Sequence, residues 1–341
     1  MTGRAAGDAA DRARTGADRP GPRTTPAHHP SATASAAPAV GVDLGGTGAR
    51  LVAWQDGTVL AAADALSADL GTGEVPERVD RLARVISGLL PTGVRPAAVG
   101  IGASGPVDVT AGVVHNHDTL PWFSGFPLTE ALGERLSVPV VIDNDAVTAA
   151  LGEHAAGAGQ GCDRMLMVTL GTGIGTAMLV DGHPVRGLDG SHPEGGHLPV
   201  TDDPARCYCG LTGCWEQAAS RSALQRMLAT RLGDDPPGRR TLEQGVRAAR
   251  TDPAIREVFT AYGTLLGRGL AALHALYQPR VTVLGGSAAT CLPLFAEGMR
   301  RALRRSPEYD VPTDIRPARL GDNAGAVGAA ILTHRVPPAG G

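Results

Sequence analysis

Short apolar runs separated by glycine-rich bends mark the start of the folded part of the chain. Residues 40–44 and 49–54 are two mostly apolar runs, and the segment 45–48 between them reads Gly-Gly-Thr-Gly. Two such runs joined by glycines predict a β-hairpin with a tight bend. The same pattern of strand, glycine bend and strand returns over residues 165–180. The sequence therefore predicts two related halves, each built around a glycine-rich hairpin.

The segments between and after these hairpins alternate between helical and strand patterns. Apolar residues at helical spacing predict helices over residues 74–90, 146–155, 221–231, 241–251, 254–276 and 324–333. Further short strands are predicted over residues 97–101, 138–142 and 281–284. Because strands and helices alternate, the predicted fold class is α/β.

The first residues of the chain differ from the rest in composition. Residues 2–37 contain no Val, Ile, Leu, Phe, Trp or Tyr. A segment without these side chains cannot bury a core, so we expect residues 1–37 to form a disordered tail. For the same reason we do not expect this tail to hold a helix-turn-helix.

Charge and composition exclude several classes of partner and of enzyme. With 31 basic and 34 acidic residues the net charge is −3, so no general basic field favours binding to nucleic acid or to an anionic membrane. No apolar run is long enough to span a bilayer. Every basic residue is an arginine. The missing lysine excludes a Walker-A ATPase, a protein kinase and a Schiff-base enzyme.

A histidine and three cysteines lie close together in the second half of the chain, namely His197, Cys207, Cys209 and Cys214. Glycines between the cysteines allow sharp turns, so the four side chains can converge on one tetrahedral zinc ion. Four protein ligands leave no open position, which predicts a structural zinc knuckle. The alternative is a set of ordinary buried cysteines, since a free cysteine behaves as a small apolar residue.

A disulfide framework fits the cysteine pattern less well. Cys162 and Cys291 are isolated, the total of 5 cysteines is odd, and a chain of 341 residues does not need disulfides to fold. Free thiols are typical of a reducing compartment, so the expected location is the cytoplasm.

The two glycine bends are candidate phosphate sites. A glycine-rich turn after a strand can direct several backbone N–H groups at one anion without a charged side chain. Two such turns, one in each half, can hold one triphosphate from both sides. Asp43 ends the first strand and adds a carboxylate suited to Mg²⁺. An ordinary hairpin turn is the alternative for each bend alone, and a turn cap is the alternative for Asp43.

The run Asp143-Asn144-Asp145 stands where a predicted strand ends and a predicted helix begins. Open α/β sheets bind their ligands at this kind of position, which makes Asp145 the candidate general base. The alternative is a helix cap, because Asp and Asn accept the free N–H groups of a helix N-terminus. The carboxylates Glu194 and Glu216 near the cysteines favour a polyhydroxy ligand, which needs several hydrogen-bond acceptors.

Together these motifs resemble the ROK family, which groups sugar kinases, related repressors and open reading frames within the actin-like ATPase fold. The resemblance spans about residues 40–333. It rests on the runs 43–47 (Asp-Leu-Gly-Gly-Thr), 144–146 (Asn-Asp-Ala), 170–175 (Leu-Gly-Thr-Gly-Ile-Gly), 194–197 (Glu-Gly-Gly-His) and 214–216 (Cys-Trp-Glu). Three residues at two places depart from the family pattern. Gly48 stands where many members carry a lysine, and His192-Pro193 replaces small residues.

The resemblance implies a role for each candidate residue. Asp145 would take the proton from the sugar hydroxyl that attacks the γ-phosphate of ATP. The sugar would be bound by Asn144, Glu194, His197 and Glu216, with Ser104 and Gly105 nearby, and His197 would also ligate the zinc. The phosphates would lie on Gly45, Gly46 and Thr47 and on Gly171, Thr172 and Gly173, and the adenosine beside Gly285 and Gly286.

The resemblance also implies a two-domain actin-like ATPase fold of the ribonuclease H-like type with a zinc knuckle. We expect a small α/β domain over residues 38–148, completed by a C-terminal helix at about 320–335. Residues 149–319 are expected to form a large α/β domain that carries the knuckle and a homodimer surface.

Three functional hypotheses follow. The first is an ATP-dependent kinase of a primary hydroxyl of a hexose, most simply glucose at its 6-hydroxyl, with Mg²⁺ as cofactor. The second keeps this chemistry but changes the acceptor to an N-acetylhexosamine or a sugar-like C7-cyclitol. The third is a sugar-responsive regulator, which the lack of a domain-sized segment before the first bend disfavours.

Overall fold

The computed structural model describes residues 37–234, 236–304 and 314–335. The expected disordered tail over residues 1–37 therefore lies, except for residue 37, outside the described residues. The division of the rest into residues 38–148 and 149–319 stays a prediction.

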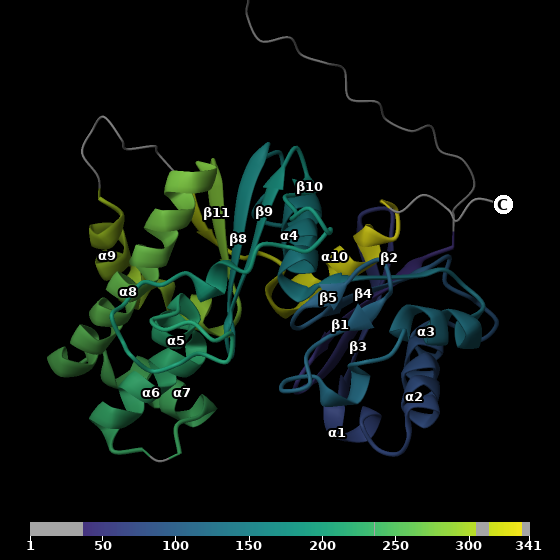
Figure 1. The fold of residues 1–341 in the computed structure, drawn as a ribbon, viewed down its shortest axis with the longest axis horizontal. Coiled ribbons are helices and arrows are strands. Elements are labelled where there is room, and N and C mark those ends of the chain that lie inside the picture. Colours follow the sequence, from purple (N-terminus) through teal and green to yellow (C-terminus); the bar gives the residue numbers. More distant parts are fainter. Residues whose placement is uncertain (1–36, 235, 305–313, 336–341) are drawn as a thin grey trace, which may run out of the picture. The chain divides into compact units, whose positions relative to one another are not determined.

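Two five-stranded sheets organise the described part of the chain (Figure 1). The first has the strand order β3 (Thr58–Leu66), β2 (Gly48–Gln55), β1 (Ala39–Gly45), β4 (Val99–Ala103) and β7 (Val140–Asn144). The second has the order β10 (His183–Pro184), β9 (Ile174–Val180), β8 (Arg164–Leu170), β11 (Val281–Gly285) and β12 (Asp314–Pro317). In both sheets a glycine-bent antiparallel hairpin continues into parallel strands, which confirms the predicted repetition.

The helices confirm the predicted α/β alternation. They are α1 (Ser67–Leu70), α2 (Val75–Gly88), α3 (Leu128–Leu136), α4 (Asp145–Ala156), α5 (Trp215–Ala219), α6 (Arg221–Leu232), α7 (Arg239–Ala248), α8 (Pro253–Tyr277), α9 (Leu292–Leu303) and α10 (Ala324–Leu332). Short 3₁₀ turns lie at Pro121–Phe123, Gly195–His197, Ser287–Cys291 and Gly321–Asn323, and β5 (Val107–Asp108) pairs with β6 (Val113–Val114). None of the helices in these described ranges is both long enough and apolar enough to cross a membrane.

Pairing between strands, rather than apolar character alone, determines where several strands begin. Strands β4 and β7 start at Val99 and Val140, slightly later than predicted, because their parallel registers with β1 and with each other begin there. The elements that were not predicted are β3, α1, β5, β6, α3, β10, α5, α9 and β12. Strand β3 is rich in alanine and partly exposed, so its pairing with β2 defines it better than its own residues do.

Helix α10 packs against the first sheet and against α4 through glycines. A Cβ atom on Gly41 of β1 would collide with the carbonyl oxygen of Ala326, and one on Gly328 would collide with that of Thr148. Only glycine permits this close approach of two backbones. The contact brings the C-terminal helix beside the strands and the helix that carry Asp43 and Asp145.

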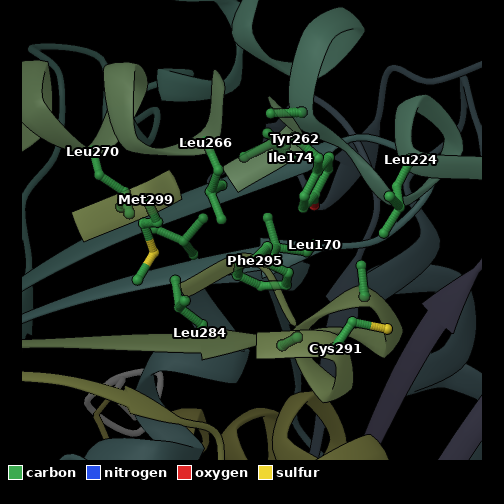
Figure 2. Close-up of a cluster of buried hydrophobic side chains, with 14 of the residues drawn as sticks. Leu170, Ile174, Leu224, Tyr262, Leu266, Leu270, Leu284, Cys291, Phe295 and Met299 are labelled. Atoms are coloured by element: carbon green, nitrogen blue, oxygen red, sulfur yellow. The ribbon is translucent and has the colours of Figure 1, made fainter. Parts of the chain in front are cut away.

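Each sheet has its own apolar core. In the second half, Leu170, Ile174 and Leu284 of the strands pack against Tyr262, Leu266 and Leu270 of α8 and against Phe295 and Met299 of α9 (Figure 2). The Tyr262 and Phe295 rings meet edge to face with centroids 5.3 Å apart. In the first half, side chains of β1, β2 and β4 pack against α2 and α3. These cores hold the strand ends that carry the candidate site.

Candidate functional site

A cavity of about 640 Å³ gathers candidate residues that are far apart in the sequence. Its wall includes Asp43, Gly45, Thr47, Asp145, Gly171, Gly285 and Gly286. Gly46 and Gly173 belong to the same bends but pack away from it, against Thr119 and against the Glu216 carboxylate. A second cavity of about 850 Å³ shares Gly285 and Gly286 with the first. The structure therefore brings both glycine bends and the candidate base together.

Asp145 is the first residue of α4 and is held in one orientation. Its Oδ2 accepts a hydrogen bond of 2.7 Å from Ser104 Oγ, and its Oδ1 accepts one of 2.8 Å from the backbone N–H of Ala146. Burial raises the pKa of Asp145, while the hydrogen bond from Ser104 acts against this rise. A fixed carboxylate with a raised pKa is suited to general base chemistry.

Asn144 caps α4 and also contacts a second candidate site residue. Its Oδ1 accepts a hydrogen bond of 2.8 Å from Ala146 N, which caps α4. Its Nδ2 donates to the carbonyl of Gly105 at 3.2 Å. The first hydrogen bond confirms the alternative interpretation of Asn144 as a helix cap. The second ties the junction of β7 and α4 to the predicted residues after β4.

Asn116 contacts two candidate site residues and was missed in the sequence analysis. Its Nδ2 donates to the carbonyl of Ser104 at 3.1 Å, and its side chain fills the space beside Gly105. Gly105 has a φ of +98°, which favours glycine. The polar run His-Asn-His-Asp directly after the apolar β6 was the available signal for this position.

Asp43 lies in the same cavity and lacks a hydrogen-bond partner for its carboxylate among the described residues. Its pKa is raised to about 7, first by burial and then by the nearby Asp145, and Arg50 only partly offsets these effects. Arg50 is itself held by Asp64 at 2.7 Å and by Asp322 at 3.3 Å. A half-buried carboxylate without a close countercharge fits a Mg²⁺ ion, whose preferred ligands are oxygens.

Arg186 was also missed, although it holds the first residue of the Asp-Asn-Asp run. Its Nη1 lies 3.3 Å from Asp143 Oδ1, and its Nη2 pairs with Asp143 Oδ2. Nη1 also donates to the carbonyl of Gly190 at 3.0 Å. This pair connects the end of β7 to the loop that leads to Glu194.

Glu194 lies close to the other candidate carboxylates. Its pKa is raised to about 7 by burial and by the charges of Asp145 and Glu216, although nearly half of its side chain is exposed. His192 Nε2 lies 3.4 Å from Glu194 Oε1. Burial lowers the pKa of His192, which favours a neutral ring that can donate to Glu194.

Glu216 connects the second glycine bend to the cysteine cluster. Its Oε2 accepts a hydrogen bond of 3.3 Å from the backbone N–H of Ile174. Its Oε1 lies 3.9 Å from His197 Nδ1 and 3.9 Å from Cys207 Sγ. The predicted sugar ligands Glu194, His197 and Glu216 therefore lie in one neighbourhood.

The four predicted metal ligands converge. The ligand atoms of His197, Cys207, Cys209 and Cys214 all lie within 4.8 Å of one another. The sulfurs of Cys209 and Cys214 are 3.6 Å apart, near the value of about 3.8 Å that a tetrahedral zinc site with its usual Zn–S bonds requires. Gly210 and Gly213 adopt positive φ angles of 91° and 68°, which confirms that the loop turns at its glycines. The donor set and spacing fit zinc.

Comparison with known proteins agrees with this geometry. The ROK family profile matches residues 39–336. The glucokinase of Streptomyces coelicolor is 33% identical over 318 residues, covering 88% of this chain and 98% of that relative. The xylose repressor of Bacillus subtilis is 29% identical over 208 residues, covering 60% of this chain and 53% of the repressor.

A solved structure extends the agreement to the fold. The ROK family glucokinase from Streptomyces griseus, determined in complex with glucose and AMPPNP, matches with a TM-score of 0.75 and 31% identity. The match covers 88% of this chain and 100% of that chain. Together with the two mixed sheets, it identifies an α/β fold of the actin-like ATPase type. The chain belongs to the ROK family.

Proposed function

We propose that the protein is an ATP-dependent sugar kinase that phosphorylates a primary hydroxyl of a hexose, most simply the 6-hydroxyl of glucose. One observation carries this proposal: the Asp145 carboxylate lies in the same cavity as Asp43 and both glycine bends. A base, a magnesium ligand and two phosphate-binding turns are the parts that phosphoryl transfer requires. The glucose and AMPPNP complex of the S. griseus relative supports both substrates.

In the proposed reaction Asp145 accepts the proton of the sugar hydroxyl. The hydroxyl oxygen forms a bond to the γ-phosphorus, the bond from that phosphorus to the bridging oxygen breaks, and ADP leaves. Ser104 keeps the carboxylate oriented through its hydrogen bond of 2.7 Å. Asn144, Glu194 and Glu216 would accept or donate hydrogen bonds to the other sugar hydroxyls.

The donor would span the two adjoining cavities. Backbone N–H groups of the bends at residues 45–47 and 171–173 would bind the phosphates, and the adenosine would occupy the 850 Å³ cavity beside Gly285 and Gly286. Asp43 would hold Mg²⁺ directly or through water. A bound magnesium ion would neutralise phosphate charge.

The cysteine cluster would hold a structural zinc ion. His197, Cys207, Cys209 and Cys214 supply four ligands, so the ion would have no open position for chemistry. Because His197 and Cys207 both approach Glu216, the ion would fix this part of the sugar site from outside.

The regulator alternative is less well supported. A binding protein does not need a carboxylate positioned by Ser104 beside two phosphate-binding bends, whereas a kinase does. The same reaction is open to other acceptors, because N-acetylhexosamines and C7-cyclitols also have a primary hydroxyl.

A coupled ADP-release assay with Mg-ATP tests the proposal. The acceptor panel contains glucose, mannose, fructose, N-acetylglucosamine, N-acetylmannosamine and a C7-cyclitol. Asp145→Asn should lower kcat by about 10²- to 10⁴-fold, the usual contribution of a general base. Asp56→Asn is the matched control, because Asp56 is exposed in the turn between β2 and β3. Turnover that survives in Asp145→Asn, or no ADP release with any acceptor, would contradict the proposal.

A further inference from the structure

Arg221 connects two loops that the proposed donor site uses. Its Nη2 donates to Thr172 Oγ1 at 3.0 Å, and its Nη1 donates to Ser287 Oγ at 3.2 Å. Thr172 belongs to the second glycine bend, and Ser287 follows Gly286. The backbone N–H of Arg221 also donates to the carbonyl of Gly171 at 2.9 Å. The guanidinium therefore lies between the loop assigned to phosphates and the loop assigned to adenosine.

The charge of Arg221 is not neutralised within the described ranges, where no carboxylate forms an ion pair with it. Its two side-chain partners are neutral hydroxyls, and its buried Nε has no hydrogen-bond acceptor in the same ranges. Arg50 and Arg239 differ, because they pair with Asp64 and with Glu243. A partly buried cation with an unused donor favours an anionic ligand.

The cavities place Arg221 at a particular part of such a ligand. Arg221 lines the 850 Å³ cavity together with Gly285, Gly286 and Ser287. Its partner Thr172 adjoins Gly171, which lines the 640 Å³ cavity that contains Asp145. A nucleotide with its base in the larger cavity and its reacting end near Asp145 would carry its middle phosphates past Arg221.

We propose that Arg221 binds the phosphates of the nucleotide that remain in ADP after transfer. This inference rests on the proposed kinase function. A guanidinium offers five donors in a rigid fork that matches phosphate oxygens, and only two of its donors are used by Thr172 and Ser287. In a chain without lysine, an arginine is the side chain that can supply this charge. Arg221 is thus a determinant of donor affinity.

Nucleotide affinities of the full chain test this inference. ADP, AMP and adenosine compete against a fluorescent ADP analogue, with wild type, Arg221→Gln and Arg221→Lys. Arg221→Gln should weaken the binding of ADP by about 10- to 100-fold, which is the range for a lost hydrogen bond to a charged group. The binding of adenosine should weaken by less than about twofold. Arg221→Lys keeps the charge and should lose less ADP affinity than Arg221→Gln.

The control is Arg231→Gln, since Arg231 is exposed in the last turn of the same helix. It should bind all three compounds like wild type. An equal loss for ADP and adenosine would mean that Arg221 shapes the nucleoside pocket only, and no loss for ADP would mean that it only joins two loops. Either result overturns the inference and leaves the kinase proposal intact. Failure of the wild type to bind ADP would overturn both.

Discussion

Arg186 and Asp143 form a bidentate ion pair that joins the end of β7 to the loop before Glu194. The Nη1–Oδ1 distance is 3.3 Å, and Nη2 pairs with Oδ2. The side chain of Asp143 is 2% exposed and that of Arg186 is 27% exposed. Asp143 directly precedes Asn144 and Asp145. The pair therefore fixes the candidate base and the candidate sugar ligands relative to each other.

Arg186→Gln should destabilise the protein strongly. The substitution leaves the buried Asp143 carboxylate without its countercharge, and breaking a buried pair in this way costs about 3–5 kcal/mol. Urea denaturation at pH 7 measures the change in the free energy of unfolding. The double variant Asp143→Asn with Arg186→Gln removes the unpaired charge and should recover part of the loss.

Arg135→Gln is the matched control for this substitution. Arg135 pairs with Asp80 at 3.1 Å, but both side chains are well exposed. Such surface pairs contribute at most about 1 kcal/mol. Equal losses in Arg186→Gln and Arg135→Gln would show that the buried pair has no special role.

Ser104→Ala should move the pH dependence of activity. Ser104 donates to Asp145 and thereby lowers its pKa against the effect of burial. Without this hydrogen bond the pKa of Asp145 rises further, so the acid limb of the kcat/KM profile should shift to higher pH. We expect a loss of about tenfold at pH 6, the scale of one hydrogen bond to a charged group, and recovery toward the wild-type value at pH 8.5.

Ser87→Ala provides the comparison, because Ser87 is exposed on α2. Its pH profile should coincide with that of the wild type. A uniform loss in Ser104→Ala at every pH would argue for misplacement of Asp145 rather than for a change in its pKa.

Asp43→Asn should stabilise the ligand-free protein, and more so at high pH. The folded state raises the pKa of Asp43 from 3.8 to about 7, so the folded protein binds this proton more tightly than the unfolded chain does. Stability is therefore lost as the pH rises between these two values. Because the Asp43 side chain is only half-buried and lines the 640 Å³ cavity, solvent screens part of this effect. We therefore expect a gain of about 1–2 kcal/mol at pH 8 that fades toward pH 4.

Thermal denaturation without added magnesium measures this gain across pH. Asp64→Asn is the contrasting variant, because Arg50 lowers the pKa of the exposed Asp64. Asp64→Asn should lower the stability of the folded protein slightly, whereas Asp43→Asn should raise it. A gain in Asp43→Asn of the same size at pH 4 and pH 8 would exclude the carboxylate charge as its cause.

The parts of the site that were predictable from the sequence are set by local chain geometry. The hairpin bends need glycines, and the Asp-Asn-Asp run needs a strand that ends where a helix begins, as β7 and α4 do. The cysteines lie near one another in the chain, so their convergence requires only a short loop. In each case the residues that act together are neighbours in sequence.

The two missed arginines act across long separations. Arg186 pairs with a residue 43 positions away, and Arg221 contacts residues 49 and 66 positions away. Such pairs depend on how the sheets and loops pack. The residues next to an arginine in the sequence do not reveal whether it is exposed or paired with a distant residue. The strand β3 was missed for the same reason. Its alanines do not by themselves favour a strand, and β3 forms because it pairs with β2.

Cys214→Ser should remove a bound zinc ion. Cys214 is buried within the cluster of one histidine and three cysteines, and a three-ligand remnant would bind the ion less tightly. We expect about one zinc per wild-type chain by plasma mass spectrometry and much less in the variant. Loss of the ion should lower the free energy of unfolding by about 2–5 kcal/mol.

Cys214→Ser should change the KM for the sugar more than the KM for ATP. His197 and Cys207 both approach Glu216, so release of the ion should loosen this carboxylate and raise the KM for the sugar by about tenfold or more, as for other supporting residues of metal sites. The KM for ATP should change little. Cys162→Ser is the control, because Cys162 lies outside the cluster. Zinc content that is unchanged in Cys214→Ser, or absent from the wild type, would rule out the metal.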